Sequence, residues 1–263
     1  MPFHTAAFWQ SVNPAGAFVS ITAVPDPILT VVTTFVQVPT LDRVVALAAG
    51  VETTAAQQAR FTAPSRRVFV LERIAPLQGN AAAASLPADP HHLMDLRDTP
   101  LKMVRGEQAT LDINSTPAAV QGQWGLVWFA DKELVPVLGE IFTARAVGAT
   151  AMVVGLWTNM PIVFAEALPR GRYQVVGFRA QSASMVAARL VFVGGTGGGV
   201  WRPGVMGVNT DRHLENPMFR WGQMGEFGQF EDTDPPTVDA LGNAADAAQV
   251  YYLDLIQVRA GPA

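Results

Sequence analysis

Cysteine is absent from the sequence, and histidine occurs only four times, at positions 4, 91, 92 and 213. The absence of cysteine excludes disulfide bonds and thiolate metal sites. His91 and His92 are the most metal-like cluster, but adjacent side chains on a strand point to opposite faces and do not easily share one ion. A catalytic triad would have to use one of these four histidines. The sequence therefore predicts no metal site, no cofactor and no catalytic residue.

Charge of either sign is also scarce. Asp, Glu, Lys and Arg make up 15% of the residues and hydrophobic residues 49%, whereas an average soluble domain has about 25% charged residues. Two explanations stay open: a compact enzyme with a large core, or a protein whose outer surface is partly buried against copies of itself or other partners. The net charge is −4, with no basic cluster beyond Arg66-Arg67. This charge disfavours direct, sequence-specific binding of nucleic acid.

Several motifs that would indicate other functions are missing. No run of about 18 apolar residues free of charge and proline occurs, which predicts no membrane-spanning helix. The start of the sequence, MPFHTAAFWQSVNPAG, is not typical of a secretory signal. The glycine run 194–199 precedes Val-Trp-Arg-Pro-Gly instead of the helix of a phosphate-binding loop, so we expect a flexible turn there. Glu231, Asp232 and Asp234 fit no EF-hand spacing, which favours an acidic turn over a calcium site.

Short segments rich in Val, Ile, Thr and aromatic residues recur along the whole chain and are separated by Gly- and Pro-rich turns. This pattern predicts an all-β fold. Residues 52–60 are expected to form a short helix or helical turn, and residues 78–90 a loop. The expected strands are 28–38, 43–51, 67–74, 93–96, 101–104, 109–113, 123–130, 139–147, 149–157, 161–166, 173–178, 185–193, 204–209 and 250–258.

The order of these strands predicts two units in tandem. Each half ends in an apolar, aromatic strand, 123–130 and 250–258, after a series of short strands, which is typical of a sandwich or barrel. We expect two tandem jelly-roll-like antiparallel β-sandwiches with long loops; one large β-sandwich is the alternative. A first strand at 17–24 is the alternative to an N-terminal arm. The predicted divisions are an N-terminal arm at 1–27, a first sandwich at 28–132, and a second sandwich at 133–263 with a long loop at 211–246.

Aromatic side chains and arginine are enriched where proteins pack against partners. Some of them lie in the predicted arm, some at the Trp-Arg-Pro-Gly corner and some in the range 211–246. The candidates for interface or packing contacts are Phe8, Trp9, Trp201, Arg202, Phe219, Trp221 and Phe227.

The C-terminal half resembles the jelly-roll major capsid proteins of tailless icosahedral viruses of bacteria and archaea. The resemblance rests on GRYQVVGFRAQSASMVAARLVF, on WRPG, on the Gly- and aromatic-rich stretch that follows, and on the closing strand VYYLDLIQV. The N-terminal half resembles this family only in the order of its predicted elements. A length of 263 residues departs from the larger members, because it leaves little room for tower insertions.

This resemblance implies two β-sandwiches in tandem and a structural virion protein without enzymatic activity. Its partners would be further copies of itself, meeting around a pseudo-sixfold axis, and other virion proteins, often with an inner membrane or packaged genome beneath the shell. It would be assembled in the host cytoplasm and located in the virion. Two other functions stay open: a lectin-like, carbohydrate-binding β-sandwich that uses Trp157, Trp201 or Trp221, and a sandwich-fold hydrolase that uses carboxylates.

Overall fold

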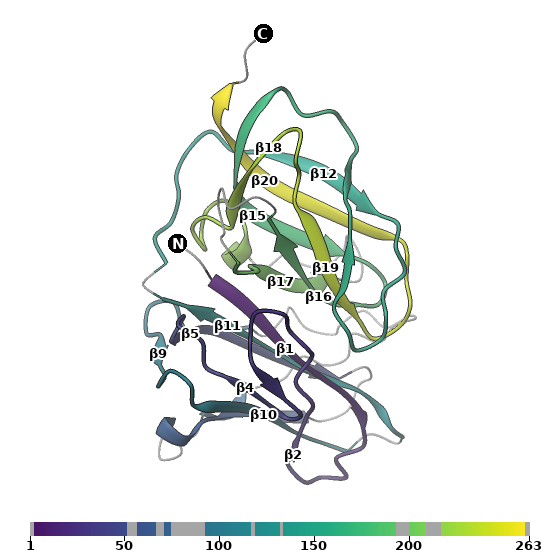
Figure 1. Cartoon of the computed structure of the whole chain (residues 1–263). Coiled ribbons are helices and arrows are strands. Elements are labelled where there is room, and N and C mark those ends of the chain that lie inside the picture. The colour runs from purple at the N-terminus through teal and green to yellow at the C-terminus, as the bar shows by residue number, and fades with distance from the viewer. Residues whose placement is uncertain are drawn as a thin grey trace. The chain divides into compact units, whose positions relative to one another are not determined.

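The computed structural model describes residues 3–51, 57–66, 71–74, 93–116, 119–131, 134–192, 200–208 and 217–260 (Figure 1). The chain is all-β, with 54% of residues in strands and 3% in helices, as the sequence predicted. It divides into two compact units. The N-terminal unit is Thr5–Glu133, and the C-terminal unit is Leu134–Ala263 together with Met1–His4.

The N-terminal unit has two sheets, in the orders β1-β11-β5-β8 and β3-β4-β10-β6-β7. In addition, β9 pairs with β5, and β2 pairs with β10. The strands are β1 (Phe3–Val12), β2 (Val19–Ser20), β3 (Val31–Val32), β4 (Phe35–Gln37), β5 (Arg43–Val51), β6 (Gln57–Thr62), β7 (Leu71–Ile74), β8 (Met94–Asp95), β9 (Leu101–Lys102), β10 (Gln108–Ser115) and β11 (Gln121–Ala130).

Strand pairing in this unit is nested. The first strand, β1, neighbours the last, β11. Inside this pair β4 pairs with β10, β5 pairs with β8 and β9, and β6 pairs with β7, all antiparallel. Strands far apart in the sequence are therefore neighbours in the sheets.

The C-terminal unit has the strand order β13-β19-β16-β17-β15-β20-β12-β14, with β18 also paired to β15. The strands are β12 (Phe142–Gly148), β13 (Thr158–Met160), β14 (Val163–Phe164), β15 (Gly171–Gln181), β16 (Met185–Val191), β17 (Gly204–Val208), β18 (Gly228–Glu231), β19 (Thr237–Gly242) and β20 (Gln249–Ala260). Pairing is again nested and antiparallel: β12 with β20, β13 with β19, β15 with β18, and β16 with β17.

Apolar side chains fill the interior of both units. Trp124 and Trp128 of β11 are fully buried in the N-terminal unit, and Tyr173, Phe178 and Tyr251 are fully buried in the C-terminal unit. All ten residues of β11 are buried, including Gln121 and Gln123. Of the 13 large hydrophobic side chains exposed among the described residues, 10 belong to the C-terminal unit, so that unit carries most of the exposed apolar surface.

Several local expectations were wrong. Residues 28–38 form two short strands, β3 and β4, because a turn at Thr33 with φ 42° separates them. The helical expectation for 52–60 fails in its described part, since Gln57–Thr62 is a strand whose pairing with β10 overrides the helical preference of Ala and Gln. Of 149–157 only Val154 makes an isolated bridge.

The predicted long loop at 211–246 contains β18, β19 and a single 3-10 turn, Pro217–Phe219. Its buried apolar residues, such as Val238 and Leu241, supply the packing that makes these strands form. In the range 1–27, where an arm was expected, β1 belongs to a sheet and residues 3–8 are buried. Three predicted features lie outside the described residues: the loop 78–90, the pair His91-His92, and the glycine turn 194–199.

Candidate interaction surface

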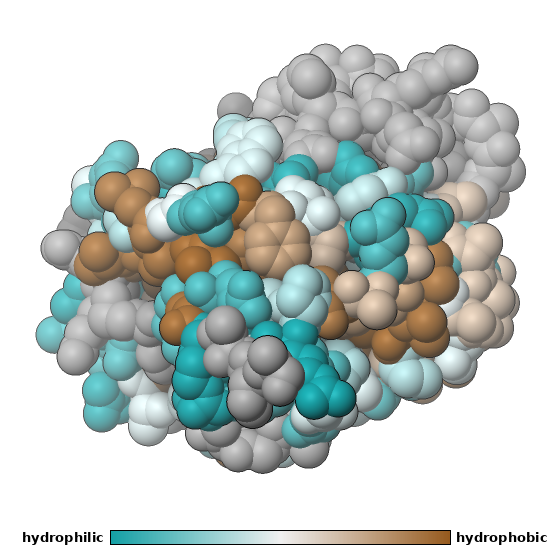
Figure 2. Space-filling view, turned by 90° about the horizontal axis from the view of Figure 1, so that it is seen from above, coloured by the Kyte–Doolittle hydropathy of each residue, from teal (hydrophilic) through white to brown (hydrophobic). Residues whose placement is uncertain are grey.

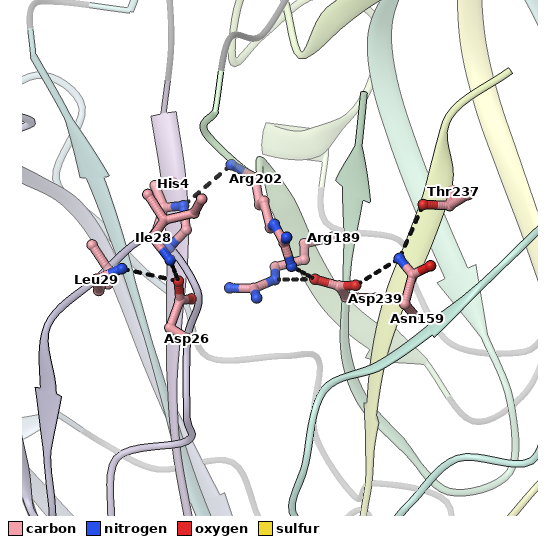
Figure 3. Close-up of polar contacts among 9 residues, drawn as sticks. All are labelled: His4, Asp26, Ile28, Leu29, Asn159, Arg189, Arg202, Thr237 and Asp239. Carbon is pink, nitrogen blue, oxygen red and sulfur yellow. Dashed lines mark hydrogen bonds and ion pairs between the residues drawn. The ribbon is translucent and has the colours of Figure 1, made fainter. Parts of the chain in front are cut away.

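A polar network in the C-terminal unit is centred on the buried Asp239 of β19 (Figure 3). Arg189 Nε donates to Asp239 Oδ2 at 2.9 Å, and Arg202 Nη1 donates to the same oxygen. Asn159 Nδ2 donates to Asp239 Oδ1 at 2.8 Å. The guanidinium of Arg189 also lies over the ring of Trp157, with Cζ 4.2 Å from the ring centroid.

This network joins β13, β16, β19 and the corner before β17, and it holds no nucleophile beside a base. The buried Asp239 carboxylate is paired with both guanidinium groups, as a buried ionised group requires. Among the described residues, no three His, Asp or Glu side chains gather closely enough to hold a metal ion. The same residues include no helix long and apolar enough to span a bilayer. The ion pairs of Asp239 tie β16 and the corner before β17 to β19.

The corner that contains Trp201 and Arg202 packs on His4. The backbone N–H of Arg202 donates to His4 Nδ1 at 3.1 Å. The Trp201 ring meets the imidazole edge-on, with centroids 5.8 Å apart and an interplanar angle of 71°. Both Trp201 and Arg202 are half-buried, so this corner is held by internal contacts.

Four other candidates are also packed within the chain. Phe8 on β1, Phe219 and Phe227 are buried, and Trp9 is half-buried. Phe227 packs edge-to-face on Phe3, with ring centroids 4.9 Å apart. Of the seven residues predicted from the sequence, only Trp221 has an exposed side chain, with 51% of its surface accessible.

The backbone of Trp221 is unusual, because its φ is 51°. Bulky L-residues rarely adopt this left-handed region, and where they do, the surrounding structure has to enforce it. The Trp221 N–H donates to Asp254 Oδ2 at 3.1 Å, and the Gly222 N–H donates to the carbonyl of Val176 at 2.6 Å. These bonds fix the turn on β15 and β20 and direct an apolar ring into solvent.

Arg220 anchors the same turn. Its Nε donates to Asp254 Oδ2 at 2.7 Å and its Nη2 donates to Oδ1 at 3.0 Å. The Thr143 hydroxyl also donates to Asp254 Oδ1, at 2.8 Å. The Arg220 Cζ lies 4.8 Å from the centroid of the Trp221 ring. One buried carboxylate thus receives the guanidinium, the backbone of the exposed tryptophan and a hydroxyl from β12.

Two glycines make this arrangement sterically possible. Gly177 faces Asp254 across the β15–β20 pair, and a Cβ at position 177 would overlap the carboxylate. Gly222 has a φ of 76°, and a Cβ there would overlap the carbonyl oxygen of Val137. Close approach of this kind requires glycine.

A segment with exposed apolar side chains runs beside the turn that carries the exposed tryptophan. Val137 N donates to the carbonyl of Gly222 at 2.9 Å, so the segment 135–139 runs beside the turn. The same segment reaches β20, where Gly139 lies against Ile256. We define the Trp221 surface as Val135, Leu138 and Trp221, which are 63%, 89% and 51% exposed. Figure 2 shows one face of the molecule, on which hydrophobic side chains reach the surface in several areas between hydrophilic ones.

A pocket of about 490 Å³ also lies in the C-terminal unit. Its lining combines apolar and polar side chains, as ligand sites do. It is lined by Phe142, Thr143, Ala144, Arg145, Ala165, Glu166, Ala167, Leu168, Pro169, Tyr173 and Gln257.

The sequence did not predict the Arg220–Asp254 pair or the pocket. Arg220 and Asp254 are 34 residues apart, and no local pattern links them. The Arg-Trp-Gly sequence at 220–222 was the one sequence feature that indicated the turn, because glycine after an aromatic residue is compatible with a tight turn. In comparisons with known proteins, no family model, no curated protein and no solved structure matches this chain.

Proposed function

We propose that this chain is a structural virion protein, a major capsid protein built from two jelly-roll units in tandem, and that it forms a shell through self-association. The observation that carries the proposal is the nested strand pairing, which is the same in both units. Jelly rolls are double-sheet structures of eight strands. Their topology is that of one long antiparallel hairpin rolled into two sheets, so that the first strand pairs with the last and so on inward.

In the C-terminal unit the eight positions of such a hairpin are filled by β12, β13, β15, β16, β17, β18, β19 and β20. Position one pairs with eight, two with seven, three with six, and four with five. Position eight also pairs with three, and seven with four, which completes two four-stranded groups. A short parallel pairing of β15 with β17 joins these groups. β14 is an additional strand beside β12.

The N-terminal unit fills the same positions with β1, β4, β5, β6, β7, β8 with β9, β10 and β11. The four nested pairs recur. The two closing pairs, β11 with β5 and β10 with β6, recur as well. Two units with one topology in one chain support a tandem architecture, and three such chains would bring six similar units around an axis.

The Trp221 surface supports self-association. Tryptophan is enriched among residues that dominate protein interfaces, and such residues lie among other apolar contacts that exclude water. An aromatic ring held outward in a strained conformation is also typical of a functional contact. The proposal implies that the protein is located in the virion, with further copies and other virion proteins as its partners and with no catalytic role.

Carbohydrate binding is the second candidate, and Trp221 favours it only in part. Trp157 is half-buried beneath Arg189, and Trp201 is half-buried against His4, so each ring is partly covered by a contact within the chain. Trp221 is exposed, but Val135 and Leu138 beside it offer no hydrogen-bonding side chains for sugar hydroxyls. This surface fits an apolar protein contact better than a glycan.

The proposal is tested by sizing the purified protein with light scattering over a range of concentration and salt, and by negative-stain microscopy of the same samples. We expect discrete oligomers, with trimers as the smallest, and closed or curved particles under assembly conditions. A monodisperse monomer at all concentrations and salts would contradict the proposal. Binding on a glycan array by such a monomer would favour the second candidate instead.

A further inference from the structure

The pocket in the C-terminal unit lies along the edge of a strand. Four consecutive residues of β12, 142–145, line it. Successive side chains of a strand point to opposite faces, so consecutive residues line one pocket only where it follows the strand's edge. Residues 165–169, Tyr173 and Gln257 complete the lining.

This edge of β12 has free backbone groups. β14 pairs with β12 only at Ala146 and Val147, and the Ala165 N–H donates to the carbonyl of Arg145 at 2.8 Å. The backbone of Arg145 therefore points away from β20. Because backbone groups alternate in direction along a strand, Thr143 presents its N–H and C=O on the same side. Among the described residues, no strand pairs with 142–144 from this side.

The pocket also offers a preformed apolar surface. Phe142 is 40% exposed, and its ring meets the buried ring of Tyr173 edge-on, with centroids 6.0 Å apart. Tyr173 stacks on Phe230 at 5.6 Å, and its hydroxyl donates to the carbonyl of Pro169 at 2.5 Å. The hydroxyl is thus satisfied, and the aromatic rings are held in place to receive an apolar group.

The charges at the rim point to an uncharged guest. Arg145 and Glu166 are both exposed and line the pocket. Their charges are opposite, so the rim has no net charge and favours neither an anion nor a cation. A free strand edge beside an apolar pocket is the arrangement that binds an extended peptide by strand addition, in which backbone bonds give affinity and the pocket selects a side chain.

We propose that this pocket receives an extended segment of a second copy of the chain, which adds as a strand to β12 at Thr143 and inserts an apolar side chain beside Phe142. The pocket lies in the same unit as the Trp221 surface. The same unit holds most of the exposed large hydrophobic side chains of the described residues. This inference rests on the proposed self-association and names one of its contacts.

The test uses the full-length protein at low and at assembling concentration. Amide hydrogen exchange at Thr143 is measured in both states, together with particle size. An outward N–H exchanges quickly in the free chain and becomes protected once a guest strand accepts from it. We expect exchange at Thr143 to slow at least about tenfold on assembly, which corresponds to about 1.4 kcal/mol.

Ala167→Trp provides the variant, because residue 167 is exposed and lines the pocket, so an indole there fills it without entering the core. Ala247→Trp is the matched control, an exposed alanine of the same unit outside the pocket. We expect Ala167→Trp to abolish the slowing at Thr143 and to weaken association at least about tenfold, with unchanged thermal unfolding. Ala247→Trp should behave as the wild type.

The outcomes separate the two proposals. The strand-addition inference is overturned if the wild type assembles while exchange at Thr143 stays fast. It is also overturned if Ala167→Trp assembles normally and Thr143 stays protected. Self-association stands in both cases. Absence of any assembly overturns both. The inference is also overturned if Thr143 is already protected in the monomer, or if native mass spectra show a small molecule retained in the pocket. Either result shows that the edge has another occupant.

Discussion

Asp254 of β20 accepts two hydrogen bonds from the guanidinium of Arg220, at 2.7 and 3.0 Å, with side-chain exposures of 0% and 8%. The same carboxylate accepts from the backbone N–H of Trp221. The ion pair and the outward position of the tryptophan are therefore one unit of structure. Loss of the pair should disturb both the stability of the C-terminal unit and the surface that the turn presents.

Arg220→Ala should destabilise the C-terminal unit by about 3–5 kcal/mol, because a buried carboxylate loses its partner. Urea unfolding followed by tryptophan fluorescence measures the change. Arg259→Ala is the matched control, since Arg259 is 70% exposed and 3.5 Å from Glu231, and it should cost at most about 1 kcal/mol. Equal losses in the two variants would show that the Arg220 pair is not a structural anchor.

Trp221→Gly should weaken self-association by at least about 2 kcal/mol, as expected for an interface tryptophan. Stability should stay near that of the wild type, because glycine relieves a left-handed conformation that costs about 1–2 kcal/mol for an L-residue. Sedimentation equilibrium measures the association, and urea unfolding measures the stability. Val120→Ala, at an exposed position of the N-terminal unit, is the control for a general loss of apolar surface. Association unchanged in Trp221→Gly would remove this surface from the interface.

Gly222→Ala and Gly106→Ala separate backbone strain from steric overlap. The two glycines have nearly the same φ, 76° and 78°, but a Cβ at 222 overlaps the Val137 carbonyl, whereas nothing lies within 4 Å of a Cβ at 106. Gly106→Ala should cost about 1–2 kcal/mol from backbone conformation alone. Gly222→Ala should cost about 1–3 kcal/mol more. Equal costs in urea unfolding would mean that the turn at 222 moves away from Val137 without penalty.

Glu107 should make the N-terminal unit sensitive to acid. Burial opposes its ionisation, but hydrogen bonds from Ser65 and the Val104 N–H, with the nearby charge of Arg66, outweigh that effect and hold its pKa below the ordinary 4.5. A lowered pKa contributes stability above pH 4.5 that is lost as the pH falls through the lower, folded-state pKa. Glu107→Gln should therefore reduce the difference in urea midpoint between about pH 7 and about pH 3.

Ser65→Ala should also reduce the difference in urea midpoint between about pH 7 and about pH 3. It removes the hydroxyl that donates to Glu107 Oε1 at 2.6 Å. The measurement is the same pair of urea titrations. An acid sensitivity that is unchanged in both variants would assign the effect to other carboxylates of the unit.

Local sequence predicted the strands best where they are long and rich in β-branched or aromatic residues. The expected strand 43–51 coincides with β5, and 123–130 lies within β11. Prediction failed where the signal was weak or where distant pairing decided the result. Residues 52–60 were predicted to form a helical turn, yet Gln57–Thr62 is a strand because β10 pairs with it residue by residue.

The sequence by itself determined an all-β chain of two successive strand groups with few charges, because alternation, β-propensity and composition are local properties. Only the tertiary structure decided which strands pair, that Arg220 meets Asp254, that Trp221 faces solvent, and that the edge of β12 borders a pocket. Each of these depends on residues that are far apart in the chain, and their contacts arise from packing and backbone pairing, which no short stretch of sequence encodes. Trp221 was a candidate as one aromatic residue among several, and the buried carboxylate beneath its turn is what distinguishes it from the others.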